Sequence, residues 1–88
     1  MRMYAKEVTI NNPTGLHARP ATQLVREAEK YQSEIRIIKE NMVINPKSIF
    51  NVLAAGLSQG IAITVEAEGT DEREAVDSLC RFIEDLKE

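Results

Sequence analysis

The chain of 88 residues is 43% hydrophobic and 28% charged, which is the composition of an ordinary globular domain. A single domain over residues 1–88 is expected, with a core too thin to enclose a deep active-site cavity. The net charge of -3 argues against direct nucleic-acid binding, which draws its affinity from a basic surface. One cysteine and one histidine exclude an internal disulfide and a closed zinc site, so neither a metal nor a cofactor is expected.

The charges are distributed unevenly along the chain. Residues 1–44 carry seven basic and five acidic side chains, whereas residues 45–88 carry four basic and nine acidic ones. A mildly basic first half favours an acidic partner. The longest apolar run, residues 52–57, is far shorter than the ~20 residues needed to cross a bilayer. The first residues also lack the apolar segment of a signal peptide, so we expect a cytoplasmic protein without membrane insertion.

Hydrophobic periodicity predicts two strands around a helix, and then a third strand, in the first half of the chain. Alternate apolar positions predict a strand over residues 3–10, which an Asn-Asn-Pro-Thr-Gly turn ends. A helix is expected to begin near Ala18, because Pro20 fits only within a first helical turn. Its apolar face consists of Ala21, Leu24, Val25, Ala28 and Tyr31. Residues 34–39 and 42–44 are predicted to form a hairpin.

A short helix follows and ends at about Ala55, before a glycine. Its start has two alternatives: Asn45 as the cap with Pro46 in the first position, or Ser48 as the cap. A helix this short cannot bury three large apolar side chains, so part of the set is expected to form an exposed docking patch. The set consists of Ile49, Phe50 and Leu53.

The clearest strand pattern of the chain covers residues 61–68, where apolar and polar positions alternate. After it, Thr70 is expected to cap a last helix with acidic residues in its first turn. The apolar stripe of that helix consists of Ala75, Val76, Leu79, Phe82, Ile83 and Leu86. The element order β-α-β-β-α-β-α, with amphipathic helices, predicts an α+β sandwich of two layers in which helices cover one face of the sheet.

His17 is the candidate for chemistry, because an imidazole is a nitrogen nucleophile that is largely neutral near pH 7. It would lie where a helix opens, and the first N–H groups of a helix favour a negatively charged group such as phosphate. The Arg19 guanidinium could add charge-assisted hydrogen bonds. On composition and spacing alone, however, a surface histidine near a helix start is the commoner explanation.

The argument for His17, that a helix start favours a negatively charged group, also applies to Ser48 at a second predicted helix start. A capping serine is the simpler explanation, and the functional one is phosphorylation, whose added charge suits the N-terminal dipole. Cys80 adjoins the stripe of the last helix and is expected to be a packing residue rather than a reactive thiol. The glycines at positions 15, 56, 60 and 69 match neither a phosphate loop nor a dinucleotide fingerprint, so ATP binding is not indicated.

The stretch around the histidine resembles the active-site signature of HPr, the histidine-containing phosphocarrier family of the bacterial phosphoenolpyruvate:sugar phosphotransferase system. It reads Thr14-Gly15-Leu16-His17-Ala18-Arg19-Pro20-Ala21-Thr22. Two further runs are similar to that family, Lys47-Ser48-Ile49-Phe50 with its regulatory serine motif and Leu57-Ser58-Gln59-Gly60 before the last strand. The resemblance covers about residues 3–86. It implies a four-stranded antiparallel sheet in the order 1-4-2-3 with three helices on one face.

The resemblance also implies roles for particular residues. His17 would accept a phosphoryl group on Nδ1 from phospho-enzyme I and donate it to sugar-specific enzyme II components, as a carrier and not as an enzyme. Arg19 would neutralise the phosphoryl group. Ser48 maps onto the serine that an ATP-dependent HPr kinase/phosphorylase modifies in many Gram-positive bacteria, where the modified form serves catabolite repression with a transcription factor. The surface presented to partners maps onto Leu16, Arg26, Lys47, Ile49, Phe50 and Leu53.

Three positions depart from common forms of the family: Glu29, Pro46 and Asn51. Pro46 could shift the start of the short helix, and the other two could change partner preference. Two alternatives stay open. One is a nitrogen-branch phosphocarrier, against which the Lys-Ser-Ile run at 47–49 argues; the other is a non-catalytic βαββαβ ligand-binding module in which His17 is incidental. A regulator without phosphotransfer is disfavoured because His17 is present.

Overall fold

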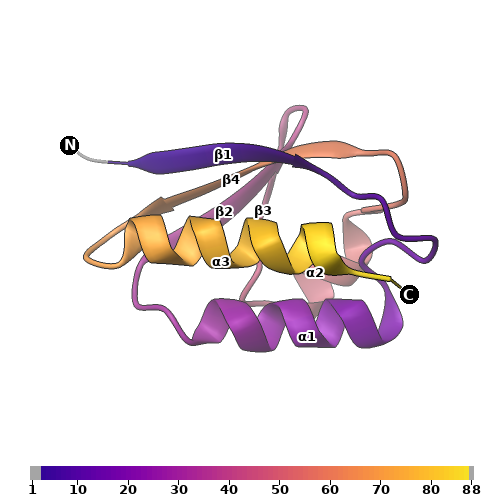
Figure 1. Cartoon of the computed structure of the whole chain (residues 1–88), viewed down its shortest axis with the longest axis horizontal. Helices are drawn as coiled ribbons and strands as arrows, with labels where there is room; N and C mark the ends of the chain where they lie inside the picture. Colours follow the sequence, from indigo (N-terminus) through magenta and orange to yellow (C-terminus); the bar gives the residue numbers. More distant parts are fainter. Residues whose placement is uncertain (1–2, 88) are drawn as a thin grey trace.

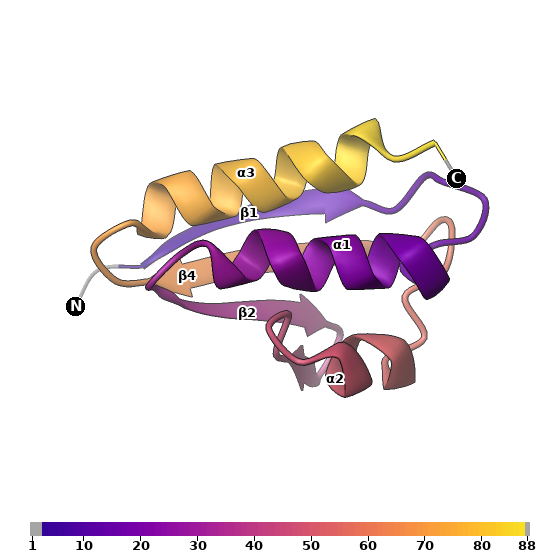
Figure 2. The ribbon, with the colours of Figure 1, turned by 90° about the horizontal axis from the view of Figure 1, so that it is seen from below.

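A four-stranded sheet and three helices form the two layers of the computed structural model (Figure 1), which describes residues 3–87. The elements are β1 (Tyr4–Thr9), α1 (Ala18–Glu29), β2 (Glu34–Lys39), β3 (Met42–Ile44), α2 (Ile49–Ala54), β4 (Ala62–Glu68) and α3 (Glu72–Asp85). Neighbouring strands are antiparallel and the order is β1-β4-β2-β3. The helices lie on one face of the sheet (Figures 1 and 2). The predicted α+β sandwich and the strand order implied by the resemblance are confirmed.

The core lies between this helical layer and the inner face of the sheet. Alternate residues of β2 and β4 are buried, among them Ile37, Ile63 and Val65, and Leu24 of α1 and Leu79 of α3 pack against them. Burying an aliphatic side chain of this size contributes about 1.5–3 kcal/mol. The period-two pattern of the strands and the stripes of the helices therefore meet in one apolar layer, as the sequence predicts.

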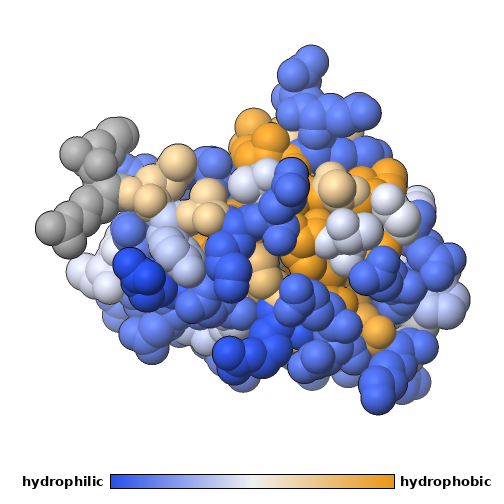
Figure 3. Space-filling model, turned by 45° about the horizontal axis from the view of Figure 1, so that its top comes forward, coloured by the Kyte–Doolittle hydropathy of each residue, from blue (hydrophilic) through white to orange (hydrophobic). Residues whose placement is uncertain are grey.

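The other face of the sheet is polar around Arg36. Its guanidinium bonds three carboxylates, with Nε 2.6 Å from Glu66, Nη1 2.8 Å from Glu34 and Nη2 3.6 Å from Glu68. The hydrogen bond to Glu66, which lies opposite in β4, is the main cause that raises the pKa of Arg36 above its ordinary value. Figure 3 shows one face of the molecule, on which most residues are hydrophilic and some hydrophobic residues are visible among them.

The start of α3 differs from the prediction, since the cap position is Asp71 and the helix begins at Glu72. The expected cap at Thr70 is therefore wrong. Asp71 also makes a contact that local patterns do not reveal: its carboxylate accepts hydrogen bonds from the backbone N–H groups of Gln32 and Ser33, both at 2.9 Å, and from the Ser33 hydroxyl. This carboxylate joins the turn before α3 to the loop after α1.

Candidate functional site

His17 occupies the cap position of α1, with extended backbone angles of φ -125° and ψ 161°. The helix begins at Ala18 as predicted, and the imidazole is half-buried. Within the described part of the chain, the ring makes no capping hydrogen bond to its own helix. Ala18 itself has φ +53°, a left-handed conformation that costs a residue with a Cβ about 1–2 kcal/mol. The helix therefore opens through a strained residue directly after the histidine.

The segment before His17 is held in place by backbone contacts. The Leu16 N–H donates to the Leu57 carbonyl at 2.8 Å, which ties this segment to the loop between α2 and β4. Gly15 has φ +65°, and a Cβ built there would lie 2.4 Å from the same Leu57 oxygen. Because only glycine combines that angle with so close an approach, Gly15 is a structural requirement of the site.

Asn12 shapes the same segment, and the sequence does not single it out. Its side chain is 2% exposed, and Nδ2 donates to the Gly15 carbonyl at 2.8 Å. Asparagine before proline is a common turn signal, but nothing in the pattern shows that this side chain points inward. Arg19 lies two residues beyond His17 and is exposed. The site therefore combines a histidine on a braced segment with a nearby exposed cation.

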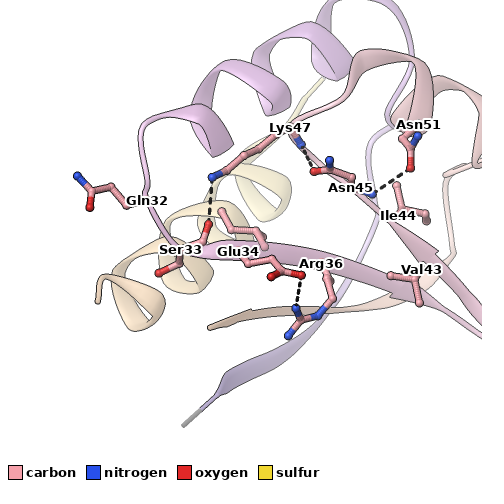
Figure 4. A pocket seen from close by; sticks show the side chains of 10 residues that line it. Gln32, Ser33, Glu34, Arg36, Val43, Ile44, Asn45, Lys47 and Asn51 are labelled. Atoms are coloured by element: carbon pink, nitrogen blue, oxygen red, sulfur yellow. Dashed lines mark hydrogen bonds and ion pairs between the residues drawn. The ribbon is translucent and has the colours of Figure 1, made fainter. Parts of the chain in front are cut away.

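Ser48 is the cap of α2, which settles the two alternatives for the start of that helix. Its Oγ accepts a hydrogen bond from the Asn51 N–H at 3.3 Å, and the helix begins at Ile49. Asn45 closes the preceding turn: its N–H donates to Asn51 Oδ1 at 3.2 Å and its Oδ1 accepts from the Lys47 N–H at 2.9 Å (Figure 4). Pro46 lies buried in this turn and does not start the helix.

Lys47 has a structural role that the sequence does not reveal. Its ammonium donates to the Tyr31 carbonyl at 2.8 Å and to the Ser33 carbonyl at 3.0 Å, the second of which Figure 4 shows. Lys47 therefore ties the turn before α2 to the loop after α1. A contribution of Lys47 to partner binding stays a prediction. Along one side of this turn runs an open groove of about 460 Å³, which is lined by the start of β2, the end of β3 and residues 45, 47 and 51, and not by His17.

Apolar side chains of α2 are exposed, as predicted for part of the set. Phe50 is 81% exposed and Leu53 is 41% exposed, whereas Ile49 is half-buried. Arg26 is exposed in the last turn of α1, which packs against α2. Leu16 is a correction: its side chain is fully buried in the core, because it anchors the segment before His17, and it cannot contact a partner.

The remaining chemistry of the described residues is limited. Cys80 is buried in the core, and burial raises the pKa of its thiol to about 11, which confirms a packing role. Among residues 3–87, no three His, Cys, Asp or Glu side chains gather in a way that could hold a metal ion. No helix of the same residues is both long enough and apolar enough to cross a membrane.

Comparison with known proteins agrees with this geometry. A family model described as "PTS HPr component phosphorylation site" matches residues 4–85. Phosphocarrier protein HPr of Buchnera aphidicola subsp. Baizongia pistaciae is 45% identical over 85 residues, which cover 97% of this chain and 100% of that protein. HPr-like protein Crh of Halalkalibacterium halodurans is 43% identical over 82 residues, which cover 93% and 98% of the two chains.

A solved structure gives the same result. The crystal structure of HPr-C-His from Thermoanaerobacter tengcongensis matches with a TM-score of 0.89 at 43% identity, covering 92% of this chain and 91% of that one. An open-faced sandwich with a histidine at a helix start, matched by relatives of this kind, defines a phosphoryl carrier and not a catalyst. The chain belongs to the HPr family of the phosphotransferase system. Membership implies partners among the proteins of that system in general.

Proposed function

We propose that His17 carries the phosphoryl group, receiving it on Nδ1 from phospho-enzyme I, which phosphoenolpyruvate charges, and passing it to sugar-specific enzyme II components. The ring nitrogen forms its bond to phosphorus as the bond between phosphorus and the donor breaks. The observation that carries the proposal is the position of His17, half-exposed on a braced segment at the opening of α1. The proposal includes a cytoplasmic location, where we expect the donor and acceptor proteins to meet.

Arg19 and the first turn of α1 are the groups that would stabilise the phosphoryl group. A helix dipole contributes about 0.3–1 kcal/mol at an exposed site, and a hydrogen bond to a charged group about 1.5–3 kcal/mol. The Arg19 guanidinium is therefore the larger single contributor. Neither contribution is large, which suits a carrier, because a group held tightly could not be passed on.

The test is incubation of the chain with phosphoenolpyruvate and enzyme I. We expect one phosphate per chain, labile in acid and stable in base, that is lost in His17→Ala. Arg19→Gln is expected to retain the phosphate but to slow its transfer. Labelling that survives His17→Ala would refute the assignment.

The second part of the proposal is regulatory phosphorylation of Ser48 by an ATP-dependent HPr kinase/phosphorylase, with a catabolite-control transcription factor as a further partner. Two observations support it. Ser48 is only half-buried, at the start of α2, and the chain is 32% identical to Crh, the Bacillus subtilis catabolite repression HPr, whose solution structure matches with a TM-score of 0.72. Added negative charge beside Phe50 and Leu53 would hinder docking on acidic partners.

A mass measurement after incubation with ATP and the kinase tests this second part. We expect a gain of one phosphoryl group that is lost in Ser48→Ala and kept in Ser58→Ala, a matched serine whose hydroxyl lies in the loop after α2. The modified chain should accept phosphate from phospho-enzyme I more slowly. An unchanged rate would show that Ser48 does not regulate transfer.

A further inference from the structure

The open groove of about 460 Å³ beside the turn before α2 contains a free sheet edge (Figure 4). β2 lines one side of the groove, and the end of β3 and the turn before α2 line the other. β3 pairs with β2 only over residues 37–39, whereas β4 pairs with β2 from Glu34 onward. Residues 34–36 of β2 therefore have β4 on one side and no strand of the described chain on the other. His17, Phe50 and Leu53 do not line this groove.

The backbone N–H and C=O groups of Ile35 point into the groove. In an antiparallel ladder, successive residues direct these groups to opposite sides of the strand. The Ile10 N–H donates to the Ile61 carbonyl at 2.9 Å, so odd-numbered residues of β4 bond toward β1 and even-numbered ones toward β2. The even-numbered residues of β2 lie opposite the even-numbered residues of β4 and bond toward them. Ile35, which is odd-numbered and lines the groove, therefore directs both of its groups away from β4.

Neither of these groups has a hydrogen-bond partner among residues 3–87. Two more residues of β3 would bring Pro46 opposite Ile35, and proline has no N–H to donate. The chain instead turns away at Asn45, whose N–H donates to Asn51 Oδ1 at 3.2 Å. Because Ile35 is only 3% exposed, its backbone donor and acceptor favour a ligand that offers the complementary pair.

The free edge is one residue long. Ser33, the next residue of the same parity, is already bonded, because its N–H donates to the Asp71 carboxylate at 2.9 Å and its carbonyl accepts from the Lys47 ammonium at 3.0 Å. On the other side of Ile35, the ladder between β2 and β3 begins at Ile37. The groove therefore offers two backbone hydrogen bonds, both at Ile35.

We propose that the groove binds an extended, basic peptide segment of another protein. One residue of the segment forms an antiparallel pair with Ile35, donating its N–H to the Ile35 carbonyl and accepting the Ile35 N–H on its own carbonyl. Strand addition at an open sheet edge is a common mode of peptide recognition. Successive side chains of a strand point to opposite faces, so the next side chain of the segment lies on the outer face of the sheet, beside Glu34.

The charges on that outer face select a basic side chain. Glu34 has a side chain that is 73% exposed and pairs with Arg36 Nη1 at 2.8 Å. Arg36 also pairs with Glu66 and Glu68, so three carboxylates face one guanidinium, which leaves a net charge of -2. The Lys47 ammonium on the opposite wall already donates to two carbonyls. A lysine or arginine beside Glu34 is therefore attracted, whereas an acidic side chain is repelled.

The test is a titration of the isotope-labelled chain with the acetylated and amidated peptide Thr-Val-Lys-Val-Thr, followed by the backbone amide resonances. We expect saturable shifts that are largest at residues 34–36, with the Ile35 amide protected from hydrogen exchange. The dissociation constant should lie in the millimolar range, because only two backbone hydrogen bonds and one exposed ion pair hold so short a peptide. His17→Ala should leave the binding unchanged.

Modified peptides and matched variants separate the two kinds of contact. Methylation of both valine nitrogens removes the backbone donors of the peptide and should weaken binding about ten-fold. Glu34→Gln should weaken binding of the unmodified peptide about two- to five-fold at low salt. Glu7→Gln is the control and should change nothing, because Glu7 is also exposed but lies on β1, the opposite edge strand. The amide spectra of both variants check that they remain folded.

Three results would overturn the proposal. The first is an Ile35 amide that stays unchanged at peptide concentrations of many millimolar, whether or not other resonances move. The second is equal binding of the methylated and unmodified peptides, which would show that main-chain pairing does not hold the segment. The third is a shift of residues 34–36 with the concentration of the chain itself, without peptide, which would assign the edge to a second copy of this chain.

Discussion

The starts of α1 and α2 are built differently, although each has a side chain proposed to accept phosphate at its cap position. At α2 the Ser48 hydroxyl is itself a structural group, because it accepts the Asn51 N–H. At α1 the backbone holds the segment in place, through the hydrogen bond from the Leu16 N–H to the Leu57 carbonyl and the close approach of Gly15 to that carbonyl. The difference suggests that His17 can gain and lose a phosphate without loss of a native hydrogen bond, whereas modification of Ser48 alters a helix cap.

The largest effect that would sharpen this contrast is expected for Gly15→Ala. The new methyl group would meet the Leu57 carbonyl at a residue with positive φ, so we expect a loss of about 2–4 kcal/mol in the free energy of unfolding. Phosphate uptake by His17 should fall with it. Gly60→Ala is the control, because Gly60 also has a positive φ but nothing lies within 4 Å of its Cβ position.

We expect the control to cost only about 1–2 kcal/mol, the penalty of the backbone angle alone. Chemical denaturation of both variants provides the measurement. If Gly15→Ala is no less stable than Gly60→Ala, the segment before His17 is not held by the backbone as described.

Ser48→Ala tests the other half of the comparison. Loss of the cap should cost about 1 kcal/mol of stability, and His17→Ala should change the stability by less than about 0.5 kcal/mol, since the ring caps nothing. The effects on phosphate uptake should be reversed, with His17→Ala inactive and Ser48→Ala active. A stability loss for His17→Ala as large as that for Ser48→Ala would erase the distinction between the two helix starts.

The start of α3 extends the comparison, because its cap residue bonds another loop. The hydrogen bond from the Ser33 hydroxyl is the main cause that holds the pKa of Asp71 below its ordinary value, and the Gln32 and Ser33 amides add to it. A carboxyl group whose pKa is lower in the folded chain stabilises the fold above its unfolded pKa. That contribution is lost as the pH falls through the folded pKa.

Asp71→Asn should therefore reduce the loss of unfolding free energy on acidification. We expect this effect to be smaller than the two above because Asp71 is only half-buried. Urea unfolding at pH values from neutral to acid provides the measurement, with the exposed Asp85→Asn as control. If the native chain and Asp71→Asn lose stability in parallel on acidification, the carboxylate does not join the two loops.

The sequence predicts the elements well, because their patterns are local. The alternation in residues 34–39 and 42–44 places β2 and β3 at their observed bounds, and Pro20 correctly places the start of α1. It also predicts that α2 exposes part of its apolar set. These predictions depend on neighbours a few residues apart.

The misses involve contacts between distant segments. The ammonium of Lys47 bonds carbonyls 14 and 16 residues away, and the Asp71 carboxylate bonds amides 38 and 39 residues away. Neither contact has a periodic signature, so the sequence reveals neither the structural role of Lys47 nor Asp71 as the cap of α3. A contribution of Lys47 to partner binding stays a prediction. Leu16 is misassigned for a similar reason, since its burial depends on how the segment folds back onto the core.

The hydrogen bond between Leu16 and Leu57 has a mechanical consequence. It connects two loops: the segment that carries His17 and the segment that follows α2. A second contact connects the same two segments, because Gln59 Nε2 donates to the Asn11 carbonyl at 2.9 Å. The segment before His17 and the loop after α2 therefore cannot move apart unless the hydrogen bond between Leu16 and Leu57 breaks.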